Sequence, residues 1–150
     1  MLFKTHLIFG LLAGLYALDF LDINHSFLFM IFVLFASILP DADHDGSRIS
    51  KEFFPFKLIS WLFNHRGIVH SVFIAGILSG ILIFFGYMSI GYGLLIGYLS
   101  HLIIDGLSTN GVMLFYPFSK FKLRGFIKVG GFIENILFFV ILGFVLWKIA

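Results

Sequence analysis

The sequence contains no cysteine and only three prolines among its 150 residues. The absence of cysteine excludes disulfides, thiolate metal ligands and a cysteine nucleophile. Charge is also scarce, because Asp, Glu, Lys and Arg make up 12% of the chain, about half the share that is usual in soluble domains. The formal net charge is only +2, which argues against a nucleic-acid partner.

Apolar side chains dominate the composition instead. Hydrophobic residues make up 60% of the chain, and 22 residues are phenylalanine. A soluble domain of this size cannot bury so much apolar surface, so the bilayer must solvate much of it. The sequence therefore predicts a single domain over residues 1–150, which is an all-α integral membrane bundle of about five short transmembrane helices.

Five apolar stretches define the expected helices: Thr5–Leu21, Ser26–Leu39, Ile68–Ser89, Ile90–Ile104 and Phe132–Ile149. Several are shorter than the roughly 20 residues of a straight span. The second and fourth stretches are the weakest candidates for independent transmembrane spans. In an alternative topology, one or two of the five stretches are re-entrant segments that do not cross the membrane. The first stretch could be a signal peptide, but no small-residue cleavage pattern follows it, so we expect a retained helix.

Glycines recur four residues apart in three of these stretches, at positions 10 and 14, 76 and 80, and 93 and 97. In a membrane this spacing lets helix backbones approach one another closely. The pattern predicts a compact bundle and is neutral about what the bundle does.

Basic residues are distributed very unevenly over the expected topology. With five spans, the N-terminus and both long loops lie on one side of the membrane. That side carries all of the ten Lys and Arg residues except Lys148. By the positive-inside rule, we expect a multi-pass protein of the plasma (inner) membrane. Its N-terminus and both long loops, with the candidate metal site described next, should face the cytoplasm.

Histidines and carboxylates gather at the cytoplasmic ends of the expected helices, and His25 is the one histidine at the opposite face. His101 and Asp105 are four residues apart, so they share a helix face. Imidazole and carboxylate ligands suit zinc, manganese or iron. We expect a divalent metal, zinc first, with manganese or magnesium as alternatives. Its expected ligands are His6, Asp41, Asp43, His65, His70, His101 and Asp105.

Each of these groups also has a purely structural interpretation. The run Asp41–Asp45 could be a solvated turn or a helix cap. Glu134 could simply be favoured at a helix N-terminus. The segment Lys120–Lys128 predicts a basic, aromatic surface on the membrane, which could also hold an anionic lipid headgroup. The gathering of so many groups at one face favours the metal site over these separate explanations.

Several sequence elements together resemble a known family. They are His6, Leu39-Pro40-Asp41-Ala42-Asp43-His44, His65-Arg66-Gly67-Ile68-Val69-His70-Ser71, Gly97-Tyr98-Leu99-Ser100-His101 with Asp105, and Thr109-x-Gly111. They resemble the membrane-bound metal-dependent hydrolase family, typified by the LexA-regulated inner-membrane protein of enteric bacteria. The resemblance spans most of the chain. The Pro-Asp-x-Asp-His and His-Arg-Gly-x-x-His elements, in this order, are specific.

This resemblance implies a hydrolase, through a more distant similarity to zinc-dependent phospholipase C enzymes. In those enzymes a His-x-x-x-Asp pair on a helix helps to hold several zinc ions, and His101 and Asp105 match that pair. The present chain is far more apolar than the soluble enzymes and lacks their additional helices. Whether His44 and Thr109 belong to the site is left open by the sequence.

On this resemblance, the expected activity is hydrolysis of a lipid or lipid-linked phosphoester by metal-activated water. Asp45 or Glu134 would accept a proton, and Arg66 would hold a phosphate through paired hydrogen bonds. Membrane lipid is therefore the expected partner. Two alternatives stay open: a transporter, because intramembrane acids and histidines also form ion pathways, and a membrane protein that binds metal without catalysis.

Overall fold

The computed structural model describes residues 1–41 and 66–150. Within them the chain forms five helices of 11 to 19 residues. They are α1 (Phe3–Phe20), α2 (Ser26–Ala36), α5 (Val72–Phe84), α6 (Met88–Gly106) and α7 (Phe132–Ile149). A 3-10 turn, η1 (Leu39–Asp41), follows α2, and one helical turn, α4 (Arg66–Val69), precedes α5. The described residues contain no β-strand, so the expected all-α class is confirmed.

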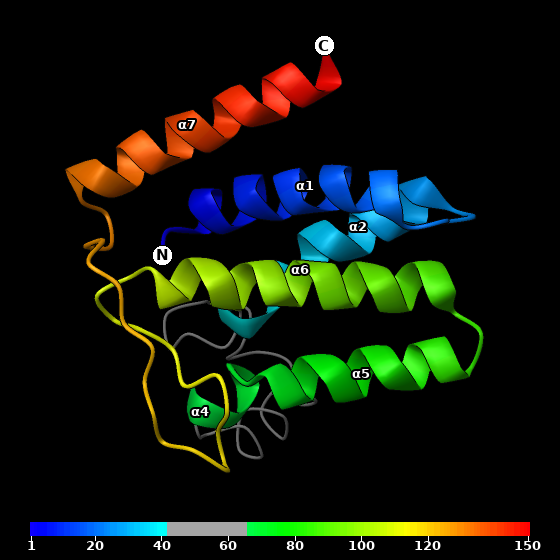
Figure 1. The fold of residues 1–150 in the computed structure, drawn as a ribbon, viewed down its shortest axis with the longest axis horizontal. Helices are drawn as coiled ribbons and strands as arrows, with labels where there is room; N and C mark the ends of the chain where they lie inside the picture. The colour runs from blue at the N-terminus through cyan, green and yellow to red at the C-terminus, as the bar shows by residue number, and fades with distance from the viewer. Residues whose placement is uncertain (42–65) are drawn as a thin grey trace, which may run out of the picture.

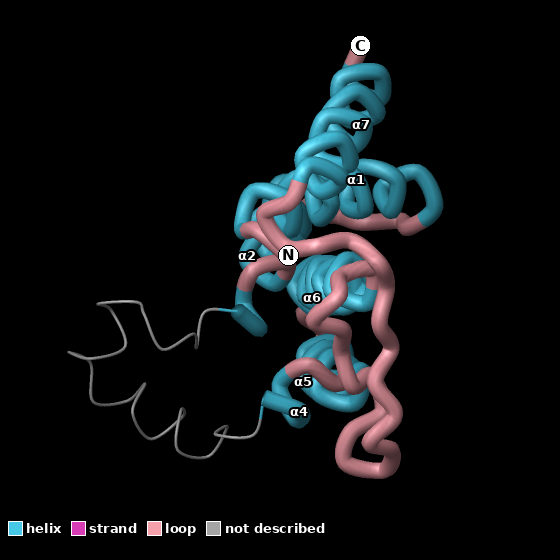
Figure 2. Tube along the Cα trace, turned by 90° about the vertical axis from the view of Figure 1, so that its left-hand side faces the viewer, coloured by secondary structure: helices cyan, strands magenta, loops and turns pink. Residues whose placement is uncertain are grey.

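Helix α6 is the central element of the bundle. It packs against α1, α2 and α5, whereas α7 packs against α1 at the periphery. Figure 1 shows α5, α6 and α1 with their axes roughly aligned and α7 tilted beyond α1, and Figure 2 shows α2 beside α1 and α6. Tyr98 and Leu102 of α6 are buried with Ala36 and Ala75 of the neighbouring helices. The core therefore lies around α6.

Three helices, α1, α6 and α7, are long and apolar enough to cross a membrane. Their 18 or 19 residues span about 27 Å at 1.5 Å per residue, close to the hydrocarbon thickness of about 30 Å. Helices α2 and α5 have only 11 and 13 residues. Phe139, Phe144 and Trp147 of α7 are exposed, as side chains that face lipid would be.

The expected helix Ile68–Ser89 is interrupted near its start. Helix α4 ends at Val69, and the Ser71 hydroxyl accepts a hydrogen bond of 3.2 Å from the Phe73 N–H. A serine in this position caps the first turn of a new helix, so α5 begins at Val72. The prediction of one continuous helix here was wrong because Ser71 satisfies a free N–H of the next helix.

The same stretch also ends earlier than expected. Gly86 has a φ of +85°, a conformation that glycine adopts without steric penalty. The N–H of Tyr87 donates to the Leu82 carbonyl at 2.9 Å, which closes the end of α5 in a typical glycine-terminated motif. Helix α6 therefore begins at Met88 and not at Ile90. Among the described helices α6 is the longest, although its apolar stretch was one of the two weakest candidate spans in the sequence.

The glycines of α6 bring its backbone against α2, as their spacing predicted. A Cβ atom at Gly93 would lie 2.6 Å from the Phe29 carbonyl oxygen. A Cβ atom at Gly97 would collide with the Val33 carbonyl oxygen and lie 2.9 Å from the Ala36 Cβ. Only a residue without a side chain fits at these two positions while the helices stay in contact.

Gly10 of α1 makes a similar contact, because a Cβ there would lie 2.6 Å from the Ser37 Cβ. The pair on α5 differs, since nothing lies within 4 Å of a Cβ built on Gly76 or on Gly80. Among the described residues, the prediction of close packing is therefore confirmed for α1 and α6 and wrong for α5.

The loop between α6 and α7, residues 107–131, is held by its own backbone. Val112 and Leu123 form an antiparallel bridge with two N–H···O bonds of 2.9 Å, and Ser108 pairs with Ile127. Gly111 has a φ of +64°, and a Cβ there would lie 2.5 Å from the Leu123 carbonyl oxygen. These contacts fold the loop back across the end of α6.

The contact between α2 and α6 can be tested at Gly97. We expect Gly97→Ala to lower the free energy of unfolding by about 1–3 kcal/mol, because the new methyl group overpacks a closed contact. Gly76→Ala is the matched control, since its methyl group meets nothing within 4 Å, and alanine favours a helix. Thermal unfolding midpoints in one detergent measure both. Equal midpoints for the two variants would contradict the described packing.

Candidate metal centre

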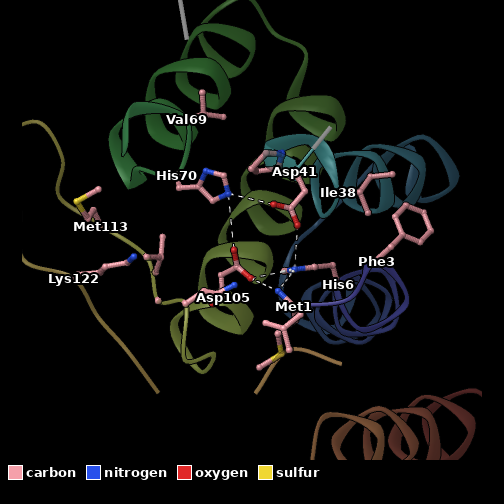
Figure 3. A pocket seen from close by; sticks show the side chains of 15 residues that line it. Met1, Phe3, His6, Ile38, Asp41, Val69, His70, Asp105, Met113 and Lys122 are labelled. Atoms are coloured by element: carbon pink, nitrogen blue, oxygen red, sulfur yellow. Dashed lines mark hydrogen bonds and ion pairs between the residues drawn. The ribbon is translucent and has the colours of Figure 1, made fainter. Parts of the chain in front are cut away.

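Four side chains from three distant segments converge at one end of the bundle. His6 comes from the start of α1, Asp41 ends η1, and His101 and Asp105 come from the last turns of α6. One ligand atom of each residue lies within 4.8 Å of those of the others. Figure 3 shows His6, Asp41 and Asp105 pointing toward one another, with His70 beside them.

The separations between these atoms suit one small cation. His6 Nε2 lies 3.2 Å from Asp105 Oδ1 and 3.5 Å from Asp41 Oδ2. His101 Nε2 lies 3.5 Å from Asp105 Oδ2 and 3.8 Å from Asp41 Oδ1. Ligand atoms about 2.0–2.1 Å from a tetrahedral zinc ion are separated from one another by about 3.3 Å. These four separations are close to that value, and all the candidate ligand atoms lie within 4.8 Å of one another.

The orientation of His101 is fixed by the end of α2. The ring is fully buried, and its Nδ1 lies 2.9 Å from the Ser37 carbonyl oxygen. Because a carbonyl only accepts, Nδ1 carries a hydrogen, and in the neutral ring Nε2 presents a lone pair to the two carboxylates. Nε2 has no hydrogen-bond partner among the described residues. A buried acceptor that faces carboxylates is unfavourable unless a cation lies between them.

His6 lies against His101 in a parallel stack. The ring centroids are 4.1 Å apart, and the planes differ by 14°. The α-amino group of Met1 lies 3.1 Å from His6 Nε2 and 2.5 Å from Asp105 Oδ1. An ammonium group only donates hydrogen bonds, so a positive charge contacts two of the four ligand atoms in this structure. The group thus has the electrostatic character of a cation site.

His70 lies at the edge of the group. Its Nε2 is 3.4 Å from Asp41 Oδ1 and 3.9 Å from Asp105 Oδ2, but it is not one of the four mutually close ligands. Burial raises the pKa of the Asp41 carboxyl, but the hydrogen bond with His70 and the nearby His101 and His6 rings together lower that pKa below its ordinary value. His70 therefore contacts both carboxylates from the side.

His6, Asp41 and Asp105 of the ligand group line a cavity of about 680 Å³, a volume in the usual range for small-molecule sites, whereas the fully buried His101 does not line it. His70 and apolar side chains such as Phe3 and Met113 line the cavity as well. Asn110 and Lys122 reach it from the loop between α6 and α7. Three of the four candidate ligands are thus accessible to a molecule much larger than water.

Glu134 has a different position from the one expected. It is fully buried at the start of α7, and its Oε1 accepts hydrogen bonds from the Leu2 N–H at 2.6 Å and the Thr5 hydroxyl at 2.9 Å. Its Oε2 accepts one from the Gly130 N–H at 2.6 Å. It does not line the cavity. These bonds anchor the segment before His6, and its role as a proton acceptor stays a prediction.

Some expected site residues lie outside the described residues, namely Asp43, His44, Asp45 and His65. Arg66 is described only as the first residue of α4. Their assigned roles stay predictions. Ser37 was missed by sequence reasoning, because its contribution is a backbone carbonyl and any residue type supplies one.

The donor set fits a divalent metal. Two imidazole nitrogens and two carboxylate oxygens, without a thiolate, suit zinc, manganese or iron. The bond from His101 to the Ser37 carbonyl is the kind of outer contact that orients metal-bound histidines. The group of His6, Asp41, His101 and Asp105 could therefore bind a metal ion.

Comparison with known proteins gives one family and one relative. A family model described as "YdjM inner membrane protein" matches residues 1–150. The uncharacterized protein YvsG of Bacillus subtilis (strain 168) is 34% identical over 104 residues, which is 67% of this chain. The match covers 64% of the length of YvsG, slightly less than two thirds. No solved structure matches the chain.

Metal content should depend on the two buried imidazoles. We expect wild-type protein, loaded with zinc or manganese in detergent and desalted, to keep about one ion per chain in a four-ligand site. His6→Ala/His101→Ala should keep none, whereas His25→Ala, which removes the histidine at the opposite end, should keep it. Elemental analysis measures all three. Metal retained by the double variant, or absent from folded wild type, would contradict the site.

The anchoring role of Glu134 predicts a graded loss of stability. Glu134→Ala leaves three donors without an acceptor and should cost about 1–3 kcal/mol for each donor that stays buried. Glu134→Gln keeps the size and one acceptor oxygen, so its unfolding midpoint should fall less. If neither variant shifts the unfolding midpoint, Glu134 does not anchor the segment before His6. A stable, metal-loaded Glu134→Gln without activity would instead favour the proton-acceptor role.

Proposed function

The chain belongs to the YdjM inner membrane protein family, and on that premise we propose that it is a membrane-embedded metal-dependent hydrolase of lipid or lipid-linked phosphoesters. The observation that carries the proposal is the convergence of His6, Asp41, His101 and Asp105 beside an open cavity that His6, Asp41 and Asp105 line. A catalytic metal keeps at least one position open to water and substrate, and the cavity beside the ligand group provides such access. Open access supports catalysis here.

Residues of the chain itself orient the candidate ligands and supply the negative charge that a cation needs. Ser37 fixes the tautomer of His101, and the two carboxylates supply the negative charge that retains a cation. A divalent cation bound here would supply Lewis acidity, which activates water near neutral pH and stabilises negative charge on a phosphoryl group. His70, in contact with Asp41 and near Asp105, is in a position to hold a proton beside both carboxylates.

The proposed orientation places this site at the cytoplasmic face of the inner membrane. The chain's basic residues, Lys148 excepted, lie on the N-terminal and long-loop side of the five-span topology, which is the cytoplasmic side by the positive-inside rule. Lys148 lies at the other end of the bundle, where it pairs with Asp19 at 2.5 Å. The protein is accordingly multi-pass, with its N-terminus in the cytoplasm.

The depth of the site favours a lipid substrate. His101 and Asp105 are in the last turns of a helix of membrane-spanning length, at the level where lipid headgroups meet the hydrocarbon. The cavity has apolar side chains such as Phe3, Ile38 and Val69 beside its polar groups. A molecule with a phosphoester joined to an apolar part complements this mixed lining.

Transport is the less favoured alternative. In the described helices, no histidine, lysine or acid lies between the group at His101 and the opposite end at Asp19 and His25. A proton or metal pathway needs such groups across the membrane. A membrane protein that binds metal without catalysis shares every ligand of the proposed enzyme and differs from it only in turnover.

Hydrolysis is tested with metal-loaded protein in mixed micelles of detergent and phospholipid, and with a soluble phosphoester. We expect hydrolysis that a chelator abolishes and that falls about 10- to 100-fold in His70→Ala, the range for residues that support a metal site. His25→Ala is the matched histidine control and should hydrolyse at the wild-type rate.

No hydrolysis by the metal-loaded wild type, or equal rates in wild type and His70→Ala, would reject the proposed enzyme. Uptake of metal into sealed vesicles, lost in His6→Ala/His101→Ala, would assign transport instead. Stoichiometric metal with neither hydrolysis nor uptake would leave the non-catalytic metal-binding protein.

A further inference from the structure

Lys122 is the one basic side chain among the described residues that line the cavity. It is exposed, and no ion pair with a described acidic residue involves it. Figure 3 shows Lys122 on the side of the pocket away from Phe3, with Asp105 between them. Asn110 lines the cavity from the same loop. The loop therefore brings two hydrogen-bond donors to the cavity that contains the ligand group.

The charge of the ligand group explains why such donors are needed. Asp41 and Asp105 contribute two negative charges, and a divalent cation contributes two positive ones. With neutral imidazoles the loaded group has no net charge, so it exerts little long-range attraction on an anion. Among the described residues that line the cavity, a phosphate meets the Met1 ammonium group, which already contacts Asp105, and the ammonium group of Lys122, which has no ion pair with a described acid.

The fold of the loop sets the position of both donors in advance. Lys122 directly precedes Leu123, whose backbone is paired with Val112 by two hydrogen bonds of 2.9 Å. Asn110 directly precedes Gly111, whose N–H donates to the Ser108 carbonyl at 3.1 Å. Backbone that is already ordered loses little conformational entropy when a ligand binds.

We propose that Lys122, with the Asn110 amide, binds the phosphate of the substrate and so selects phosphate-bearing ligands for this cavity. The inference rests on the proposed function and adds to it the residue that determines specificity. Ammonium and amide N–H groups donate to phosphate oxygens, and a charged donor makes the stronger bond. A phosphomonoester carries about −1.5 to −2 charges at neutral pH, so it should bind more tightly than a phosphodiester.

The test measures phosphate binding separately from turnover. Zinc-loaded protein in a neutral detergent is titrated with inorganic phosphate by calorimetry, and in parallel with phosphatidate in mixed micelles. Lys122→Ala should weaken both affinities about 10- to 100-fold, the equivalent of a charged hydrogen bond. Lys122→Arg should stay within about fivefold of wild type, and so should Lys120→Ala, which removes the same charge from the loop outside the cavity.

Each outcome decides one point. Equal losses in Lys120→Ala and Lys122→Ala would replace the subsite with a general attraction of the loop for anions. Absence of phosphate binding by zinc-loaded wild type would overturn it altogether. If the protein hydrolyses phosphoesters but Lys122→Ala has wild-type affinity, only the subsite fails. If phosphate binds through Lys122 but nothing is hydrolysed, only the proposed enzyme fails.

Tighter binding of phosphatidate than of inorganic phosphate would identify a lipid as the source of the phosphate group. Equal affinities would identify a soluble phosphate ester. In both cases, the loss of affinity in Lys122→Ala is the measurement that supports the phosphate subsite.

Discussion

The arrangement of this protein depends on two carboxylates and two imidazole lone pairs facing one another at the end of a membrane bundle. Like charges about 4 Å apart repel by about 4 kcal/mol at an effective dielectric constant of 20. The His6 and His101 side chains are 1% and 0% exposed and Asp105 is 14% exposed, whereas Asp41 is 37% exposed, so water at Asp41 reduces this repulsion. A positive charge relieves this repulsion, and the Met1 ammonium group partly does so here. A cation that binds this group would therefore also stabilise the fold.

Helix α6 combines the packing of the bundle with the chemistry of the site. Gly97 closes the contact with α2, and His101, one turn later on the same face, thereby reaches the carbonyl of Ser37. The Tyr98 hydroxyl donates to the Val69 carbonyl, next to His70. The glycine spacing that compacts the helices is thus also the reason that ligands from separate segments meet.

Sequence reasoning recovered the features that depend on residue type and spacing. The apolar stretches gave the five helices, the pair His101 and Asp105 gave the ligand face, and the quoted motifs gave an inner-membrane family that the comparison confirms. Sequence reasoning missed the helix boundaries and side-chain partners that depend on backbone N–H and carbonyl groups. Ser71 and Gly86 divide an apolar run through hydrogen bonds to N–H and carbonyl groups. The partners of Glu134 include backbone N–H groups, which no motif reveals.

The distribution of the ligands along the chain also fixes when the site is completed during synthesis. Met1 and Asp105, which are in contact, are 104 residues apart. At about 5–20 residues per second, a ribosome needs roughly 5–20 s to make the residues between them. For most of that interval α1 is already made, while His101 and Asp105 do not yet exist. A nascent chain that stalls within α5 therefore has membrane helices but lacks two of the four candidate ligands, so an ion held by all four would bind only late in biogenesis.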